Sequence, residues 1–388
     1  MLKSDPASAA YREQLVAALR RQGAIRSQPI ADAFATIPRE RFLPAFYERV
    51  DREWVLHRFS EEASAWVRWI YQDEALVTQL DARALPRSSS SQPSVMARML
   101  EALDVQPGQR VLEIGTGTGY NAALLAHLTG DPHAVTAIEL DATLARQAEQ
   151  VLHEVVGPVQ VNAGDGRLGD SSRAPFDRII VTASTDRIAR PWFAQLAPGG
   201  RLVLPLQGSL QASGFLVIEK TGQEGHGAFL HPTLHFLSLR SEDEPEEHSS
   251  RELFQQPVLQ EVFLEASDPL LQAVQEEPFR WFLQWAWPEH GALQILPMTS
   301  PEGKQALLLK DARLVSILQV SQRSDGSWSG KSHGSVPLWS TIKDLAAFYQ
   351  QIGQPGQEAF QVCLENNQAA LIVMIDGKAY YLRDLFSA

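Results

Sequence analysis

The spacing of apolar and polar positions divides the chain into blocks with different predicted structure. In residues 1–87, apolar side chains recur every three to four positions, as around Tyr11 and Leu15, and this period predicts a helical N-terminal segment. In residues 88–240, short apolar runs alternate with amphipathic stretches, including a predicted helix at 142–156. The predicted strands of this second block are 110–114, 134–140, 159–163, 178–183 and 201–206.

Strands that alternate with helices predict a parallel sheet with right-handed crossovers, because each helix carries the chain back to the same end of the sheet. The predicted fold class is therefore α/β, with a doubly wound, Rossmann-like sheet. Two further strand-like runs, 215–219 and 234–239, follow without a helix between them. We expect them to pair as an antiparallel hairpin at the edge of the sheet.

A third block follows an acidic segment. Residues 241–250 contain five carboxylates, one proline and no bulky apolar side chain, so 241–252 is predicted to be a linker. Beyond it, 253–388 is predicted to be an α+β domain whose Trp281, Trp285 and Trp287 lie in the core rather than in a ligand site. Its predicted elements are a helix at 338–351 and strands at 306–309, 314–320, 360–364 and 370–375.

Composition and charge narrow the choice of partners. The chain has 388 residues, with 34 Lys and Arg against 46 Asp and Glu, and the resulting net charge of -12 would repel nucleic acid. Arg39 and Arg41 are expected on solvent-exposed helix faces. The single cysteine, Cys363, excludes an internal disulfide, and no N-terminal apolar stretch predicts a signal peptide or membrane span. We therefore expect a cytoplasmic protein without nucleic-acid or membrane partners, with the oligomeric state open and a monomer favoured.

A glycine-rich turn gives the first indication of chemistry. The predicted strand 110–114 runs into Gly115-Thr116-Gly117-Thr118-Gly119-Tyr120 and then into a helical pattern at 121–128. Glycines at such a corner let the backbone approach a ligand closely. Glu139 ends the next predicted strand, where its carboxylate can accept hydrogen bonds from both ribose hydroxyls of an adenosine ligand.

The spacing of the glycines distinguishes between two adenosine cofactors. Gly115-x-Gly117-x-Gly119, with Glu113 before it, differs from the Gly-x-Gly-x-x-Gly of dinucleotide folds and resembles motif one of class I methyltransferases. An acidic residue beside the loop suits the positive centre of S-adenosylmethionine and would repel a pyrophosphate. Asp165 ends the third predicted strand and is expected to bind the adenine amino group. The predicted cofactor-binding residues are Glu113, Gly115, Thr116, Gly117, Gly119, Tyr120, Glu139, Leu140, Asp165, Gly166 and Thr182.

Several ordered motifs resemble one family within that class. Residues 37–44, 90–101, 111–120, 164–167 and 196–205 are similar, in order and spacing, to protein-L-isoaspartate O-methyltransferases. The resemblance implies that a methyl group passes from S-adenosylmethionine to an Asp or isoAsp carboxylate of a peptide or protein. S-adenosylhomocysteine is the second product, and loss of methanol from the ester then closes a succinimide.

The resemblance also implies which residues face the substrate. Ser91 matches the serine of the family's Thr-Ile-Ser-Gln-Pro motif, which lies beside the transferred methyl group, and is the predicted catalytic residue. Ser89, Ser90, Gln92 and Ser184 are predicted to contact the substrate. A carboxylate is already ionised at pH 7, so the reaction needs orientation and exclusion of water rather than a strong base. No metal site is expected, because the histidines have no carboxylate partner at metal-ligand spacing.

Departures from the family pattern leave the substrate open. Ser89-Ser90 replace the family's Thr-Ile, residues 66–86 look like an insertion, and the C-terminal domain is additional. These features resemble a subgroup that methylates Asp in cyclised ribosomal peptides of the lanthipeptide and graspetide type and so installs an aspartimide. The C-terminal domain would then recognise the peptide. The alternatives are a general isoaspartate repair enzyme, a module that binds cofactor and peptide without chemistry, and a small-molecule methyltransferase on the same fold.

Overall fold

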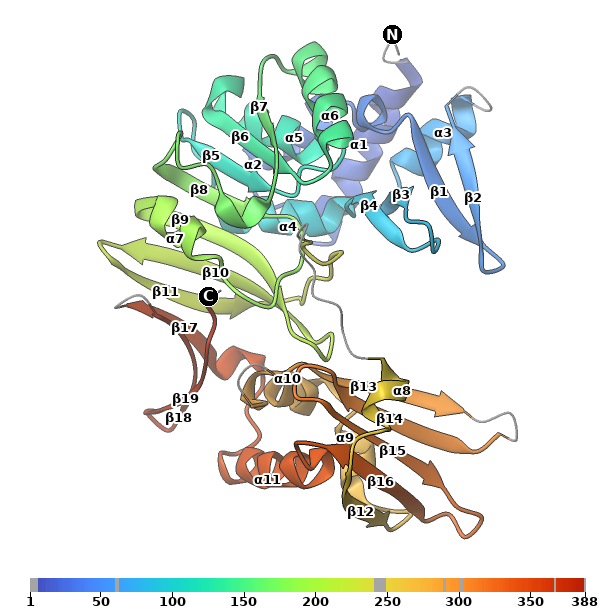
Figure 1. Cartoon of the computed structure of the whole chain (residues 1–388). Helices are drawn as coiled ribbons and strands as arrows, with labels where there is room; N and C mark the ends of the chain where they lie inside the picture. Colours follow the sequence, from blue (N-terminus) through green and yellow to red (C-terminus); the bar gives the residue numbers. More distant parts are fainter. Residues whose placement is uncertain are drawn as a thin grey trace.

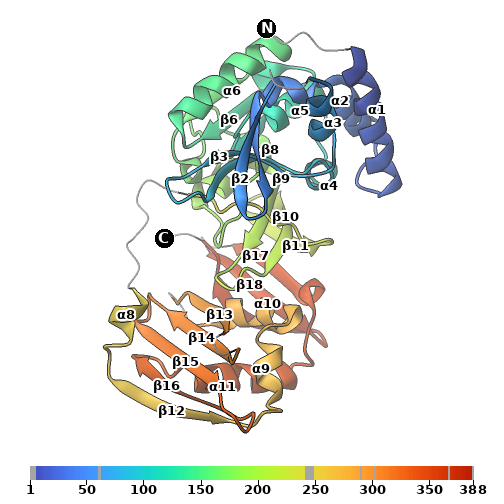
Figure 2. The same ribbon diagram turned by 90° about the vertical axis from the view of Figure 1, so that its right-hand side faces the viewer.

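The computed structural model describes residues 6–59, 63–240, 249–288, 291–299, 303–365 and 368–386. These residues form a ten-stranded, a five-stranded and a four-stranded sheet. The five-stranded sheet lies below the ten-stranded sheet in both views (Figures 1 and 2). The four-stranded sheet lies to the right of the parallel strands of the ten-stranded sheet in Figure 1. Within the described residues, no helix combines the length and the apolar character that are needed to cross a lipid bilayer.

The parallel half of the ten-stranded sheet follows the prediction. Its strands lie in the order β9-β8-β5-β6-β7, and the order reverses between β5 and β8. Such a reversal creates a crevice at the carboxyl ends of the strands, where ligands bind in open α/β sheets. The strands are β5 (Val111–Ile114), β6 (Val135–Glu139), β7 (Gln160–Ala163), β8 (Phe176–Val181) and β9 (Leu196–Gln207).

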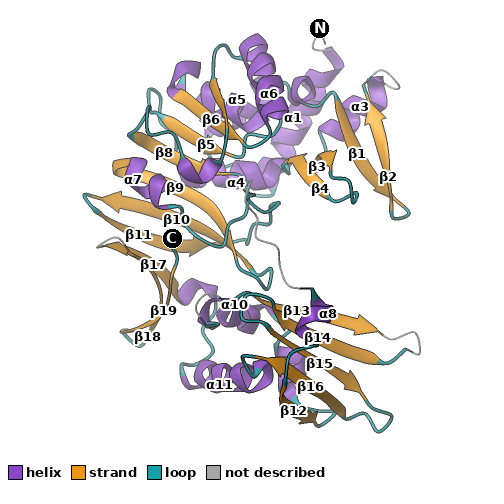
Figure 3. Ribbon diagram, viewed as in Figure 1, coloured by secondary structure: helices purple, strands orange, loops and turns teal. Residues whose placement is uncertain are grey.

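Helices cover both faces of this half, as the purple and orange elements of Figure 3 show. Side chains of α4 (Pro93–Leu103), α5 (Tyr120–Thr129) and α6 (Ala142–Val155) share one core with Val111 and Ile180. The core on the other face contains Leu112 and Trp192, the latter from α7 (Arg190–Gln195). Val111 and Leu112 join different cores because successive side chains of a strand point to opposite faces.

The predicted hairpin is confirmed for its first strand and wrong for its second. β10 (Ser213–Thr221) pairs with β11 (Glu224–Leu230) through a tight turn in which Gly222 has a φ of 62°. Glycine adopts this left-handed conformation without strain, and it allows a two-residue hairpin turn. Residues 234–239 run instead past the end of β8, where Ser184 exchanges backbone hydrogen bonds with Leu237 and Leu239.

The C-terminal block is divided between two sheets instead of forming one separate domain. β17 (Phe360–Glu365), β18 (Gln368–Ile375) and β19 (Lys378–Asp384) extend the ten-stranded sheet, because β17 pairs with β11. Apolar residues alternate with polar ones along β17, and Val362 and Leu364 enter the core that also contains Leu112. The prediction of one separate domain over 253–388 is therefore wrong for β17, β18 and β19, which belong to the ten-stranded sheet.

The rest of the C-terminal block forms a module whose residues lie between β11 and β17 in the sequence. Its sheet has the order β12-β16-β15-β14-β13, and one face packs on helices. Trp281, Trp285 and Trp287 are buried, which confirms their predicted place in the core. The predicted linker lies outside the described residues at 241–248, and α8 begins at Ser250. The module contains α8 (Ser250–Leu253), β12 (Val258–Leu264), α9 (Pro269–Ala273), α10 (Glu277–Ala286), β13 (Leu293–Thr299), β14 (Gln305–Asp311), β15 (Ser316–Gln322), β16 (Trp328–Gly334) and α11 (Leu338–Gln351).

The N-terminal segment is helical only in part. It has α1 (Pro6–Arg21), α2 (Gln28–Thr36), the short 3-10 helix η1 (Arg39–Phe42) and α3 (Ala63–Ile70). It also has a sheet of β1 (Ala45–Val50), β2 (Glu53–Arg58), β3 (Leu76–Leu80) and β4 (Pro86–Ser90), which the sequence did not predict. The turn between β1 and β2 places Asp51 and Arg52 at positive φ without a glycine to signal it. β4 carries its serines toward the crevice of the large sheet.

Candidate active site

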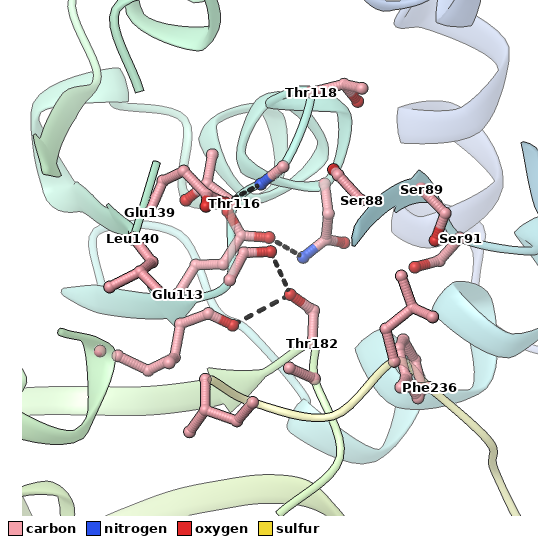
Figure 4. A pocket seen from close by; sticks show the side chains of 18 of the residues that line it. Ser88, Ser89, Ser91, Glu113, Thr116, Thr118, Glu139, Leu140, Thr182 and Phe236 are labelled. Carbon is pink, nitrogen blue, oxygen red and sulfur yellow. Dashed lines mark hydrogen bonds between the residues drawn. The ribbon is translucent and has the colours of Figure 1, made fainter. Parts of the chain in front are cut away.

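A pocket opens at the carboxyl ends of β5, β6 and β8. One wall is the glycine-rich turn between β5 and α5, the opposite wall is the serine run 88–91, and segment 236–240 closes a third side. Figure 4 shows Ser89 and Ser91 across the pocket from Glu113 and Glu139. The predicted site residues that line the pocket are Ser89, Ser90, Ser91, Glu113, Gly115, Thr116, Gly117, Tyr120, Glu139, Leu140, Gly166 and Thr182.

The glycine turn needs residues without side chains for two different reasons. Gly115 has a φ of 89°, and a Cβ atom there would lie 3.3 Å from Oγ1 of Thr182. The Thr182 hydroxyl donates a hydrogen bond of 2.7 Å to the Gly115 carbonyl and so holds the turn against β8. Gly119 faces away from the pocket, because a Cβ atom there would lie 3.2 Å from Cβ of Ala148 on α6. Gly115 therefore shapes the pocket, whereas Gly119 allows α5 and α6 to pack.

Glu139 holds the turn from the neighbouring strand. Its Oε2 accepts a hydrogen bond of 2.8 Å from the Gly117 N–H, and its Oε1 accepts one of 3.0 Å from the Asp141 N–H. The side chain lines the pocket although the residue is only 7% exposed. An ionised carboxylate can accept about four hydrogen bonds, so two remain for a ligand. This capacity matches the two hydroxyls of a ribose.

Glu113 is a fully buried acid at the base of the same pocket. One of its oxygens accepts a hydrogen bond of 2.7 Å from the Asn121 side chain. Burial raises the pKa of Glu113 to about 7, against hydrogen bonds from Asn121 and Thr116 that favour the ionised form. Glu113 can therefore gain or lose a proton near neutral pH.

Three buried polar atoms of residues that line the pocket have no partner among the described residues. They are Oε2 of Glu113, Oδ1 of Asn121 and the hydroxyl of Tyr120, and all three residues line the pocket. A buried polar atom without a hydrogen bond costs about 1–3 kcal/mol, so this arrangement indicates a polar ligand. S-adenosylmethionine fits, because its ammonium group can donate to the Glu113 and Asn121 oxygens. These residues would hold the amino-acid end of the cofactor.

Four predicted residues, Gly119 among them, do not line the pocket. The Asp165 carboxylate accepts the Arg167 N–H at 2.9 Å and forms an ion pair of 2.7 Å with the guanidinium of that residue. Gln92 precedes α4 as its N-cap. Ser184 is buried, and its hydroxyl accepts the Phe236 N–H at 3.2 Å. Ser184 therefore positions the segment that closes the pocket, while adenine binding by Asp165 stays a prediction.

Other pocket residues were not predicted. Arg87, Ser88 and Asn121 line the pocket, as does the segment 236–240. Asn121 is the second residue of α5, directly after the glycine turn, and this position could have indicated it. Segment 236–240 carries no comparable signal, because only its backbone pairing with Ser184 brings it to the site.

The expectation that Arg39 lies on an exposed face is wrong. The residue is 0% exposed and lies behind the serine run. There its guanidinium donates a hydrogen bond of 3.1 Å to the Ser91 carbonyl. The fork of five N–H donors in arginine explains this burial, because backbone carbonyls from several loops can satisfy it together. Arg41, two residues further on, is partly exposed and pairs with Glu154 at 2.7 Å.

Comparison with known proteins identifies the family. Residues 10–230 match the family model "Protein-L-isoaspartate(D-aspartate) O-methyltransferase". This span includes residues 66–86, so the expected insertion lies inside the family match. A protein-L-isoaspartate O-methyltransferase of Aeropyrum pernix is 36% identical over 219 residues, which are 54% of this chain and 73% of the relative. One from Anaeromyxobacter dehalogenans is 39% identical over 203 residues, which are 52% of this chain and 83% of the relative.

The fold likeness extends beyond the family match. A solved structure of a protein-L-isoaspartate O-methyltransferase covers 92% of this chain and 97% of its own, with a TM-score of 0.51 and 24% sequence identity. This likeness shows the fold, including the class I methyltransferase sheet. Because the family model matches more than half of the residues, the chain belongs to the protein-L-isoaspartate(D-aspartate) O-methyltransferase family of S-adenosylmethionine-dependent carboxyl methyltransferases.

Proposed function

We propose that this enzyme methylates the free carboxylate of isoaspartyl residues in peptides and proteins, in the cytoplasm. The observation that carries the proposal is the pocket, in which a hydroxyl-rich serine wall faces the glycine turn and its two acids. The relatives described above, 36% and 39% identical, bear the name of this activity. A cytoplasmic location agrees with the single cysteine, because reducing compartments do not favour disulfide frameworks.

Different residues of the pocket have different roles in the reaction. S-adenosylmethionine, when bound, supplies the methyl group that the acceptor carboxylate takes. Ser91 and its neighbours orient that carboxylate with their hydroxyl groups, and no residue needs to remove a proton from it. Glu139 holds the glycine turn by accepting a hydrogen bond from the Gly117 N–H, so the cofactor and the acceptor carboxylate are held in a fixed relative orientation. The ester then loses methanol when the neighbouring backbone nitrogen attacks it, which closes the succinimide.

A dedicated, cyclised ribosomal peptide is the second candidate substrate. Ser89-Ser90, in place of the family's Thr-Ile, are the residues that favour it, because they alter the wall that faces the substrate. The C-terminal module does not favour it, since an isoaspartate methyltransferase of known structure is similar in fold over 92% of this chain. The named relatives support general isoaspartate methylation, so aspartimide installation in a modified peptide stays a prediction. Peptide recognition by the module is likewise a prediction.

A pair of peptides that differ at one linkage tests the proposal. The purified chain and S-adenosylmethionine are incubated with an isoaspartyl peptide or with the same sequence containing normal Asp. Mass spectrometry is expected to show one added methyl group on the isoaspartyl peptide, followed by loss of methanol. Methylation of neither peptide, together with methylation of a cyclised peptide encoded near the gene, would favour the second candidate.

Glu113 gives a prediction for the pH dependence of cofactor binding. Its pKa of about 7 means that the carboxylate is mostly protonated at pH 6 and mostly ionised at pH 8. The cationic cofactor favours the ionised form, so its dissociation constant is expected to fall about 10-fold between these pH values. Isothermal titration calorimetry with S-adenosylmethionine measures the change.

Glu113→Gln provides the matched control, because glutamine keeps the size of the side chain and removes the titration. The variant is expected to bind S-adenosylmethionine more weakly at pH 8 and to lose most of the pH dependence of its affinity; an unchanged profile would contradict the assignment.

The free energy of unfolding has the opposite dependence on pH. The folded pKa lies above the ordinary 4.5, so the stability from this group is present below about pH 4.5 and lost as pH rises through 7.

A further inference from the structure

Arg39 lies buried directly behind the serine wall. It begins η1, and its guanidinium donates to carbonyl groups of two separate segments. The first segment precedes β3, where the acceptors are Ile70 at 2.7 Å, Gln72 at 3.3 Å and Glu74 at 3.2 Å. The second is the serine wall, where the acceptors are Ser90 at 3.4 Å and Ser91 at 3.1 Å. One side chain thus connects the serine wall to the segment that follows α3.

The positive charge of Arg39 has no direct ion-pair partner among the described residues, although the nearby carboxylate of Asp73 favours the charged form. Its acceptors are neutral carbonyl and hydroxyl oxygens. The adjacent Glu40 is held elsewhere, because its carboxylate accepts from the Tyr71 hydroxyl and lies 3.4 Å from Arg12. Burial lowers the pKa of Arg39 to about 10, so the guanidinium stays protonated at neutral pH. A buried charge of this kind acts over a longer range than one in water.

The contacts of Arg39 act on the backbone of the serine wall. A guanidinium bound to the carbonyls of Ser90 and Ser91 polarises the peptide groups whose N–H donors belong to Ser91 and Gln92. Ser90 is held twice, since its hydroxyl also accepts from Arg39 at 3.3 Å. The guanidinium carbon lies 5.9 Å from the ring centre of Tyr120, which also lines the pocket.

We propose that Arg39 is a positioning residue for the methyl acceptor. It fixes the backbone of Ser90 and Ser91 so that an incoming carboxylate meets ordered donors, and its buried charge attracts that carboxylate. The inference rests on the proposed function for the identity of the acceptor, but not for the effect on the serine wall. A purely structural role would instead destabilise the whole fold and both walls of the pocket together.

Arg39→Lys tests this role, because lysine keeps the charge and loses the fork that joins the two segments. Arg41→Lys, on the same short helix, is the control, since Arg41 pairs with Glu154 outside the pocket. Hydrogen exchange is measured at residues 90–92 and at 113–119 in both variants. We expect Arg39→Lys to speed exchange at 90–92 while 113–119 keep the wild-type rate, and the control to change neither segment.

Kinetics with the isoaspartyl peptide provide the second readout. For Arg39→Lys, kcat/KM is expected to fall about 10-fold, because misplaced donors weaken orientation, while the dissociation constant for S-adenosylhomocysteine stays within threefold. Tyr71→Phe removes the hydroxyl that accepts from the Arg39 backbone N–H at 3.2 Å and that donates to Glu40. It loosens Arg39 without changing its charge, so it is expected to lower kcat/KM in the same direction, and it serves if Arg39→Lys does not fold. Wild-type exchange at 90–92 in these variants, or an equal loss of peptide turnover and cofactor affinity, would overturn the inference. A wild-type enzyme without turnover would overturn the proposed function alone, since the exchange experiment still decides the role of Arg39.

Discussion

Glu139→Ala is expected to weaken cofactor binding at least 100-fold. The carboxylate is positioned by the N–H groups of Gly117 and Asp141, and its remaining acceptor capacity faces the pocket. Two hydrogen bonds from ribose hydroxyls to a charged acceptor contribute about 1.5–3 kcal/mol each, so losing both costs about 3–6 kcal/mol. Calorimetric titration with S-adenosylhomocysteine measures the dissociation constant.

Glu149→Ala is the matched control for this variant. Glu149 lies exposed on α6, so its replacement removes the same charge without reaching the pocket. The control should bind S-adenosylhomocysteine as the wild type does. Glu139→Gln should fall between the two, because one amide oxygen can still accept from the Gly117 N–H. An affinity within threefold of the wild type for Glu139→Ala would show that ribose recognition lies elsewhere.

Ser91→Ala is expected to lower kcat/KM for an isoaspartyl peptide about 100-fold. The Ser91 side chain lines the pocket opposite the two acids. In the proposed function its hydroxyl donates to the acceptor carboxylate. Loss of that donor leaves the carboxylate poorly oriented, and displacements of about 1 Å can cost two orders of magnitude in rate. The fold should not change, since Arg39 holds the backbone carbonyl of Ser91 and not its side chain.

The readout for Ser91→Ala separates catalysis from cofactor binding. Affinity for S-adenosylhomocysteine should stay within threefold of the wild type, because the glycine turn lies on the other wall. Ser171→Ala, in an exposed turn, makes the same chemical change away from the pocket and should retain full turnover. Undiminished turnover of Ser91→Ala would remove the residue from the substrate site.

The sequence predicted the cofactor side of the pocket because that side is local. A strand, a glycine turn, a helix and the acid of the next strand follow one another over thirty residues, from 110 to 139. Their order alone places Glu113, Gly115 and Glu139 together, since parallel neighbouring strands end at the same edge of a sheet. Glu139 was predicted to bind ribose. Its second role, accepting a hydrogen bond from the Gly117 N–H, could not be predicted, because it depends on how closely the turn approaches β6.

The substrate side could not be predicted in the same way because distant segments build it. Arg39 meets Ser91 only through β3 and β4, a sheet that the apolar pattern did not indicate. The strand β4 reads Pro-Arg-Ser-Ser-Ser and has no apolar alternation, so pattern analysis cannot detect it. Charge alone suggested an exposed Arg39, since an arginine is seldom buried without a carboxylate. Five backbone carbonyls from two segments made the burial stable here.

The pairing of β11 with β17 affects how the chain folds as it leaves the ribosome. Ala228 of β11 pairs with Gln361 of β17, and the residues of the whole five-stranded module are synthesised after the first and before the second. Until then β11 is an open strand edge, and such edges can pair with other chains. Late closure of a sheet by residues far apart in sequence is also slow, because a long loop must be ordered first. The edge of β11 therefore stays available for pairing with other chains until β17 has been synthesised.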